Sequence, residues 1–238
     1  MISGLYSAAS GMAAHQAKLD VLANNLANAD TPGFKADLIT IDPSVDLAND
    51  LSTLPSPTSI VAAGRPGLDL SPGVLRQTGN PLDLAIVGPG LFAVETPLGE
   101  RYIRAGAFTR DAGGYLTTAE GFRVLGSSGA IRVPDGGMVL DARGRTADGA
   151  SIRVVTGPGG PGLVKVGANL YAPVDGASLP PDLPDSTVVQ GHLETSNVNV
   201  VRSMVDMLAT MRTYEAHQRM IQAIDQTAGQ AANELGRA

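Results

Sequence analysis

Residues 1–35 read MISGLYSAASGMAAHQAKLDVLANNLANADTPGFK, and this stretch decides the fold of the chain. Apolar residues recur in it every seven positions, at Leu5, Met12, Leu19 and Leu26. That spacing is typical of an apolar seam along one face of a helix. It predicts a helix over residues 2–29, about 40 Å long at 1.5 Å per residue, which ends before Thr31-Pro32-Gly33 because proline cannot continue the helical hydrogen bonds. A helix of this length needs a partner to cover its seam.

The other end of the chain predicts that partner. Residues 199–235 again carry apolar side chains at intervals of seven, at Met207, Tyr214, Ile221, Ala228 and Leu235. Opposite charges four residues apart, as in Arg202 and Asp206, support an exposed helical face. We therefore expect residues 1–35 and 196–238 to form one domain, in which long N- and C-terminal helices pair as in a coiled coil.

The middle of the chain has a different character, since all 16 prolines fall between Pro32 and Pro184. Residues 36–72 are acidic and broken by proline, and they predict an extended connector. Residues 73–195 show short apolar segments separated by turn residues, as in Asp111–Gly114 and Ser127–Gly129. The fold class expected is therefore α+β, with an all-β outer domain inserted between the two helices.

The strands expected in this inserted domain are short. They cover residues 82–87, 91–94, 101–104, 107–110, 115–118, 122–125, 131–133, 138–140, 152–155 and 163–166.

Composition excludes several functional classes. The net charge is −6, and no dense cluster of Lys or Arg suggests a nucleic-acid partner. Residues 1–35 and 195–238 are each electrically neutral, so charge repulsion does not oppose the packing of many copies. Cysteine is absent, which excludes disulfides and thiolate chemistry. No apolar run is long enough to span a membrane, and no cleavable signal peptide is evident.

Few residues could support catalysis. The histidines are His15, His192 and His217, and none belongs to a zinc-binding or nucleophile motif. His15 and His217 lie on opposite terminal helices. They could form a functional pair, but ordinary histidines beside an apolar seam are the favoured interpretation. We expect no catalytic, cofactor-binding or metal-binding residues, no small-molecule substrate and no enzymatic activity.

Two groups of residues leave alternatives open. Asn24, Asn25 and Asn28 could cap the end of the first helix, or they could form hydrogen bonds between neighbouring helices that fix their register. The methionines at 204, 207, 211 and 220 could form an adaptable recognition surface or pack in the core. In an assembly both interpretations hold together.

Several short motifs occur along the chain: NNLAN at 24–28, TPGFK at 31–35, TGNPLDLAI at 78–86, GLF at 90–92, AGAFTRD at 105–111, GYLTT at 114–118, GHLETSNVN at 191–199 and RTYE at 212–215. Together they resemble the rod and hook proteins of bacterial flagella. The chain has no room for the additional outer domains of hook proteins, so the resemblance favours a rod subunit. Residues 223–233 resemble proximal-rod members and residues 194–200 also resemble a distal-rod member; the proximal type is predicted.

This resemblance implies a structural function. Members of the family pair their terminal helices into an inner domain that lines an axial tube, and they carry the β domain outside. They are exported through the flagellar type III apparatus without a cleaved signal peptide, and they assemble in the periplasm. The implied partners are further copies of the chain and other proximal and distal rod proteins, in a basal-body rod that transmits motor torque to hook and filament.

The residues expected to form the assembly interface lie on the two seams and in the turn after the first helix. They are Leu5, Met12, Leu19, Leu22, Asn24, Asn25, Leu26, Asn28, Pro32, Gly33, Phe34, Met204, Met207, Leu208, Met211, Tyr214, Ile221, Ile224 and Leu235. The alternative functions are a distal-rod or hook-associated subunit and, less favoured, a periplasmic enzyme or adhesin that acts through its β domain.

Overall fold

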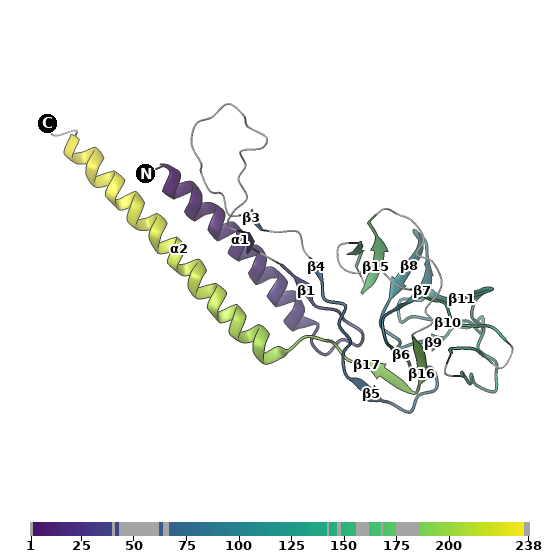
Figure 1. Ribbon diagram of the computed structural model, residues 1–238. Coiled ribbons are helices and arrows are strands. Elements are labelled where there is room, and N and C mark those ends of the chain that lie inside the picture. The colour runs from purple at the N-terminus through teal and green to yellow at the C-terminus, as the bar shows by residue number, and fades with distance from the viewer. Residues whose placement is uncertain are drawn as a thin grey trace. The chain divides into compact units, whose positions relative to one another are not determined.

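The computed structural model describes residues 2–39, 41–42, 62–63, 67–141, 143–146, 149–155, 162–167, 169–174 and 186–235. Across these residues the chain forms two α-helices and seventeen β-strands (Figure 1). The helices are α1 (Ile2–Ala27) and α2 (Val200–Leu235). All the strands lie between them in sequence, so the fold is α+β, as expected.

The strands are short and most pair antiparallel. Their bounds are β1 (Asp37–Leu38), β2 (Ile41–Asp42), β3 (Ala62–Ala63), β4 (Gly67–Leu68), β5 (Leu75–Gln77), β6 (Leu84–Val87), β7 (Leu91–Thr96), β8 (Gly99–Ile103), β9 (Thr109–Arg110), β10 (Leu116–Thr117), β11 (Arg123–Gly126), β12 (Gly129–Ala130), β13 (Val154–Val155), β14 (Leu163–Lys165), β15 (Leu170–Pro173), β16 (Thr187–Gln190) and β17 (His192–Glu194).

The chain divides into two compact units. Unit 1 comprises residues 1–27, 37–67 and 199–238, and unit 2 comprises residues 28–36 and 68–198. The turn after α1, which the sequence analysis groups with the first helix, is thus part of unit 2. Most of the predicted connector at 36–72 lies outside the described residues; its described parts include β1 to β4.

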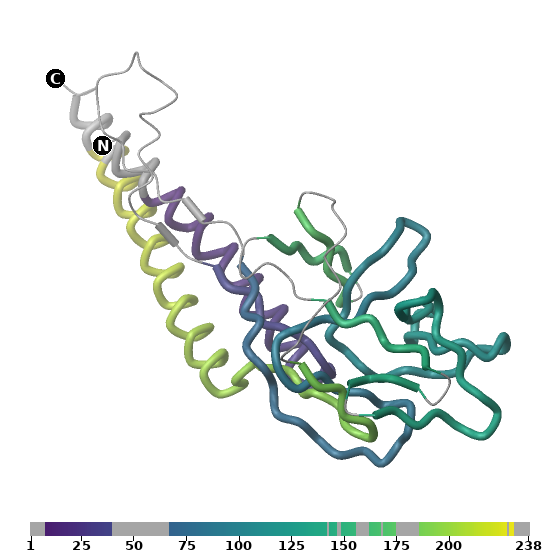
Figure 2. The backbone as a smooth tube through the Cα atoms, turned by 45° about the vertical axis from the view of Figure 1, so that its right-hand side comes forward, coloured from purple at the N-terminus to yellow at the C-terminus, as the bar shows by residue number. Residues whose placement is uncertain are grey.

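In unit 1 the two helices pack side by side and run in opposite directions (Figures 1 and 2). Apart from Asn25, the buried positions of α1 whose side chains are described are small residues, Ala8, Gly11 and Ala14. Small side chains let a neighbouring helix approach closely, and the ring of His217 in α2 packs against the backbone of Gly11. Strands β2 and β3 pair with each other, and all of β1, β2 and β3 contact α1.

In unit 2 a nine-stranded sheet has the order β14-β15-β8-β7-β11-β10-β9, with β12 on β11 and β13 on β7. The central strand β7 is buried on both faces, because Phe92 and Val94 enter one apolar cluster while Leu91 and Ala93 enter another. Two further ladders join distant parts of the chain: β6 pairs with β16, and β5 pairs with β17 (Figure 1).

The turn chemistry predicted for this unit is confirmed. Residues 111–114 connect β9 to β10 and residues 127–128 connect β11 to β12, with Gly114 and Gly129 at positive φ. Two predicted strands are wrong. Residues 131–133 follow β12 rather than form a strand, and within 138–140 only Leu140 makes an isolated bridge. The first helix ends two residues earlier than predicted, because Asn28 already forms a turn with Thr31.

Candidate assembly surface and buried anchor cluster

The turn after α1 depends on glycine. The Thr31 N–H donates to the carbonyl of Asn28, and the Thr31 hydroxyl donates to its side-chain oxygen, both at 3.2 Å. Gly33 then adopts φ 68°, and a Cβ at this position would lie 2.4 Å from the backbone nitrogen of Ala105. Any other residue at position 33 would therefore collide with unit 2 backbone. The turn leads directly into Phe34 and Lys35, which are both buried.

The adjacent asparagines of α1 hold the first strand of the connector. The Asn25 side chain is buried and makes two 2.8 Å hydrogen bonds to the backbone of Asp37, donating to its carbonyl and accepting from its N–H. Asn24 is exposed and donates to the Asp37 carboxylate at 2.9 Å. Asn28 is half-buried and acts locally with Thr31. The Asn25 side chain therefore forms the pair of backbone hydrogen bonds that a neighbouring β-strand would form with Asp37. Neither sequence-based alternative predicted this role.

Replacing Asn25 with alanine is expected to destabilise unit 1 by about 1–3 kcal/mol, because the Asp37 N–H and carbonyl both lose their partner. Urea unfolding followed by circular dichroism measures this loss. Asn24→Ala is the matched control at the next position; its hydrogen bond is exposed, and we expect a cost below about 1 kcal/mol. Equal effects of the two substitutions would contradict the assignment.

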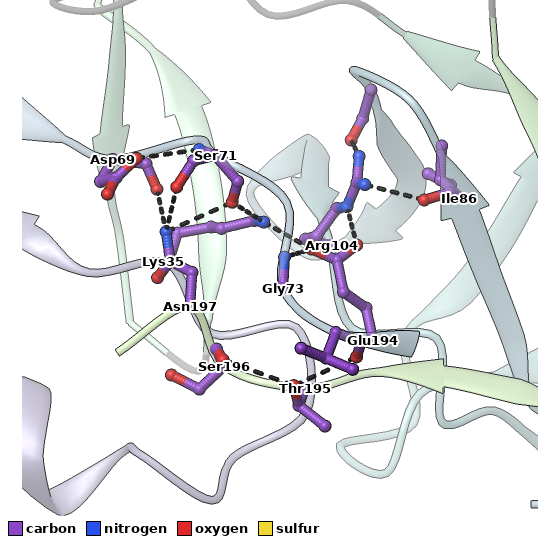
Figure 3. Close-up of polar contacts among 12 residues, drawn as sticks. Lys35, Asp69, Ser71, Gly73, Ile86, Arg104, Glu194, Thr195, Ser196 and Asn197 are labelled. Atoms are coloured by element: carbon purple, nitrogen blue, oxygen red, sulfur yellow. Dashed lines mark hydrogen bonds and ion pairs between the residues drawn. The ribbon is translucent and has the colours of Figure 1, made fainter. Parts of the chain in front are cut away.

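Unit 2 contains a buried ionic cluster whose residues are far apart in sequence (Figure 3). The Lys35 ammonium donates to Oε1 of Glu194 at 2.6 Å, and the Arg104 Nε donates to Oε2 at 2.6 Å. The Gly73 N–H donates to Oε1 at 2.8 Å. We call Lys35, Arg104 and Glu194 the anchor cluster. The exposed fractions of the three residues are 1%, 4% and 2%.

Backbone carbonyls compensate the second positive charge of the anchor cluster. Lys35 also donates to the carbonyl of Ser71 at 2.6 Å. The terminal nitrogens of Arg104 donate to the carbonyls of Ile86, Gly88 and Gly90. Both cations are thereby satisfied although only one carboxylate is present, which is the condition for burying charge at tolerable cost.

The anchor cluster holds together the two segments of unit 2 that flank the helices in sequence. The Gly33 N–H donates to the backbone carbonyl of Glu194 at 2.8 Å. The Asn197 side chain accepts from the Ala36 N–H and donates to the carbonyl of Asp69, both at 2.8 Å. Residues 28–36 and 192–198 are thus fixed to each other inside unit 2.

The protonation states follow from these contacts. Burial alone would raise the pKa of Glu194, but the hydrogen bonds from Lys35 and Gly73 and the positive charges of Arg104 and Lys35 outweigh burial and hold its pKa below the ordinary value. Burial lowers the pKa of Lys35, and the hydrogen bond and charge of Glu194 oppose that shift. The carboxylate of Glu194 is therefore ionised at neutral pH.

Sequence reasoning missed all three members of the anchor cluster. Lys35 is the last residue of the motif TPGFK, and Glu194 lies within the motif GHLETSNVN. Arg104 immediately precedes AGAFTRD. The only sequence feature that could have indicated these residues is that each is a charged residue within an otherwise small or apolar segment. Nothing in the local spacing relates position 35 to position 194.

Helix α2 exposes a continuous apolar stripe over its first three turns. Its members recur at helical spacing with exposed fractions from 45% to 72%: Val201, Met204, Val205, Leu208 and Met211. We call these five residues the outer stripe. The opposite face of α2 is half-buried at Met207, Tyr214, His217, Ile221 and Ile224. The predicted interface residues of α2 therefore divide between a face covered within unit 1 and a face open to solvent.

The predicted residues of the first helix and its turn are less exposed. Met12, Leu19, Leu22 and Leu26 are half-buried on α1, as is Pro32 in the turn, whereas Gly33 and Phe34 are buried in unit 2. Lys165 stands 3.9 Å from the centre of the Phe34 ring and donates to the carbonyl of Lys35. The side chains of Leu5 and Leu235 lie outside the described residues.

Two specific features are absent from the described residues. They contain no group of three or more His, Asp or Glu side chains that could hold a metal ion. Neither helix, as far as it is described, carries an apolar segment of the length needed to cross a bilayer.

Comparison with known proteins identifies three matching segments. Residues 5–35 match the family described as "Flagella basal body rod protein", and residues 85–154 match the "Flagellar hook protein FlgE/F/G D1 domain". Residues 189–235 match "Flagellar basal body rod FlgEFG protein C-terminal". The first and third segments contain all of the predicted interface residues.

Similar proteins cover nearly the whole chain. The basal-body rod protein FlgG of Bacillus subtilis (strain 168) is 33% identical, over 98% of this chain and 99% of that protein. FlgF of Escherichia coli (strain K12) is 37% identical, over 90% of each chain. FlgF of Caulobacter vibrioides (strain ATCC 19089 / CIP 103742 / CB 15) is 33% identical, over 100% of this chain and 99% of that protein.

Proposed function

This chain belongs to the family of flagellar basal-body rod proteins of the FlgF and FlgG type, and from that premise we propose that it is a structural, non-enzymatic subunit that polymerises into the rod. The rod acts as a drive shaft and carries motor torque to hook and filament. The observation that supports this proposal most directly is the outer stripe of α2.

The outer stripe suits an assembly better than a free monomer. It places five large apolar side chains side by side in water. The opposite face of α2 is already covered within unit 1, where α2 packs against α1. The proposed occupant is the terminal helix pair of a neighbouring subunit of the same kind. Both terminal stretches are electrically neutral, so copies can pack without charge repulsion. A head-to-tail contact between different faces of successive copies generates a helical array.

Unit 1 and unit 2 take different roles in this proposal. The antiparallel helix pair of unit 1 forms the inner, axial domain and extends into a coiled coil with its neighbours. The β-rich unit 2 forms the outer domain, and the anchor cluster fixes the two segments that lead into the helices. The proposed interface comprises the seam residues named from the sequence together with Val201 and Val205, which the sequence analysis did not include.

The proximal rod is the proposed position of the subunit. Its closing segment AIDQTAGQAAN at 223–233 resembles FlgF, whereas residues 194–200 also resemble FlgG, and relatives with both names share about a third of their residues with this chain. The proposed partners are copies of itself, other proximal and distal rod proteins and the flagellar type III export apparatus. The proposed location is the periplasm-spanning rod, reached without a cleaved signal peptide.

An in-frame deletion in the source organism tests this function, with swimming scored and isolated basal bodies imaged. We expect non-motile cells whose rods stop before the distal rod and hook, and restoration by the intact gene. Normal swimming with complete hooks and filaments would overturn the rod assignment. Complete rods that lack only hooks would instead favour a distal or hook-associated position.

A further inference from the structure

The two helices of unit 1 bring two histidines face to face. His15 of α1 and His217 of α2 have ring centres 5.4 Å apart and planes tilted by 31°. The ring of His217 also packs on the backbone of Gly11, one helical turn before His15; a Cβ at position 11 would lie 3.1 Å from Cε1 of His217. The imidazole of His217 therefore packs against α1 at two successive turns, at Gly11 and at His15.

Both imidazoles carry a buried nitrogen without a hydrogen-bond partner. Among the described residues, neither Nδ1 of His15 nor Nδ1 of His217 has one. A neutral imidazole tolerates this, because one of its nitrogens bears only a lone pair. A protonated imidazole has N–H donors on both nitrogens, so protonation leaves a buried charged donor unsatisfied. A second protonated ring 5.4 Å away adds repulsion between like charges.

The charged groups found to act on His15 are both cationic and do not neutralise such a charge. On α1 the charged side chain near His15 is Lys18, which is also positive. On α2 the charged neighbours of His217 in sequence, Glu215 and Arg219, are exposed. Of the strands that contact α1, β3 contains only alanine, while β1 and β2 contribute Asp37 and Asp42. Asp37 is bonded to Asn24 and Asn25, more than two turns along α1 from His15.

We propose that the contact between His15 and His217 makes the packing of α1 against α2 sensitive to pH: the helix pair is closed when the imidazole of His15 is neutral and opens when it becomes protonated. The inference concerns unit 1 alone, and it stands whether or not the chain forms rods. A metal-binding role is not favoured, because no third ligand joins the two histidines among the described residues.

The direction of the effect can be worked out from His15. Burial lowers its pKa, and the nearby His217 and Lys18 lower it further. The unfolded chain therefore binds protons on this residue at a higher pH than the folded chain does. Stability consequently rises with pH across this interval, is complete above the unfolded value of about 6.5, and falls as the pH drops below it.

Hydrogen exchange of the full chain at low protein concentration tests the proposal. We compare amide protection in residues 8–22 and 207–221 at pH 7.5 and pH 5.0, after correction for the intrinsic exchange rate. In the wild-type chain we expect exchange of these amides to become at least about tenfold faster at pH 5.0, which corresponds to about 1.4 kcal/mol. The β-strands of unit 2 should not show the same change, since His15 and His217 lie in unit 1.

Variants distinguish the histidine pair from other acid effects. His15→Gln and His217→Gln, singly and together, should remove most of the difference between the two pH values. His192→Gln is the matched control, because it removes the remaining histidine of the chain, which lies in unit 2; it should behave like the wild type.

Three results would overturn the proposal: corrected exchange in the wild type that does not change with pH, a pH effect that persists in the double variant, or wild-type helices unprotected at pH 7.5. The first and third need no variant, so a substitution that fails to fold does not rescue the proposal.

Discussion

Replacing Glu194 with glutamine is expected to destabilise unit 2 by about 3–5 kcal/mol, which is a large part of the stability of an ordinary domain. The substitution keeps the shape of the side chain but removes its charge. Lys35 and Arg104 then remain as two buried cations without a carboxylate. Urea unfolding, followed by the near-ultraviolet circular dichroism of the buried Tyr102 and Tyr171, measures the loss.

Two controls separate the loss of a buried counter-charge from the loss of any ion pair. Asp135→Asn removes the partner of Arg110 in the same unit, but the Asp135 side chain is 93% exposed and its loss should cost less than about 1 kcal/mol. Lys35→Met is more informative, because it leaves Arg104 and Glu194 as a balanced pair. It should cost clearly less than Glu194→Gln. If Lys35→Met is the more damaging of the two, the charge argument is wrong.

Acid provides a second measurement of the same effect. Because the pKa of Glu194 is held below its ordinary value in the folded chain, the stability it contributes is complete above the unfolded value of about 4.3. That contribution is lost as the pH falls through the lower, folded pKa. The difference in unfolding free energy between the wild type and Glu194→Gln should therefore be constant from pH 7 to about pH 5 and shrink below about pH 4. A difference independent of pH would mean that the substitution acts through packing.

Local periodicity explains which parts of the fold were predictable. The two helices were found from sequence because an apolar seam repeats within each of them, and the repeat depends only on the helix itself. The hairpin turns were found because their glycines adopt backbone conformations that other residues avoid, as Gly114 does. These signals come from neighbours in sequence and do not require knowledge of the tertiary fold.

Burial within the helix pair was harder to predict. The seam named from sequence consists of large residues such as Met12 and Leu19, yet these are half-buried whereas the small residues Ala8, Gly11 and Ala14 are buried. A close approach between helices selects for small side chains. The spacing of Gly11 and Ala14 in the sequence indicates such an approach, but the hydrophobic repeat of leucine and methionine does not report it. For the same reason the sequence did not distinguish the covered face of α2 from its outer stripe.

Long-range pairing accounts for the remaining differences. Ile131 was predicted to lie in a strand, but its N–H donates to the carbonyl of Val124 and its carbonyl accepts from Leu116, so its backbone is satisfied by two different segments. Strand β17 pairs with β5, and Glu194 reaches Lys35 across 159 positions. Such contacts are fixed by the fold as a whole, and one sequence without an alignment carries no local pattern for them.

Replacing Leu208 with aspartate is expected to abolish polymerisation while leaving the monomer folded. Leu208 is 59% exposed at the centre of the outer stripe, so the substitution removes little buried surface within the chain. In the proposed assembly the same side chain is covered by a neighbouring subunit. Its loss there costs about 2 kcal/mol of apolar burial, and an unpaired carboxylate adds the cost of desolvating a charge. Together these terms weaken each contact by at least about 100-fold.

Sedimentation of the purified chain over a range of concentrations, together with swimming of a deletion strain that carries the variant, measures the effect. Ala209→Asp is the matched control: it introduces the same charge at the next position, which is exposed but lies about 100° around the helix from Leu208. It should polymerise and support swimming far better than Leu208→Asp. Because both variants should retain the wild-type circular dichroism spectrum, a difference between them reports on assembly rather than folding. If Leu208→Asp assembles and swims like the wild type, the outer stripe does not contact a neighbouring subunit, and the rod must be held together by other surfaces.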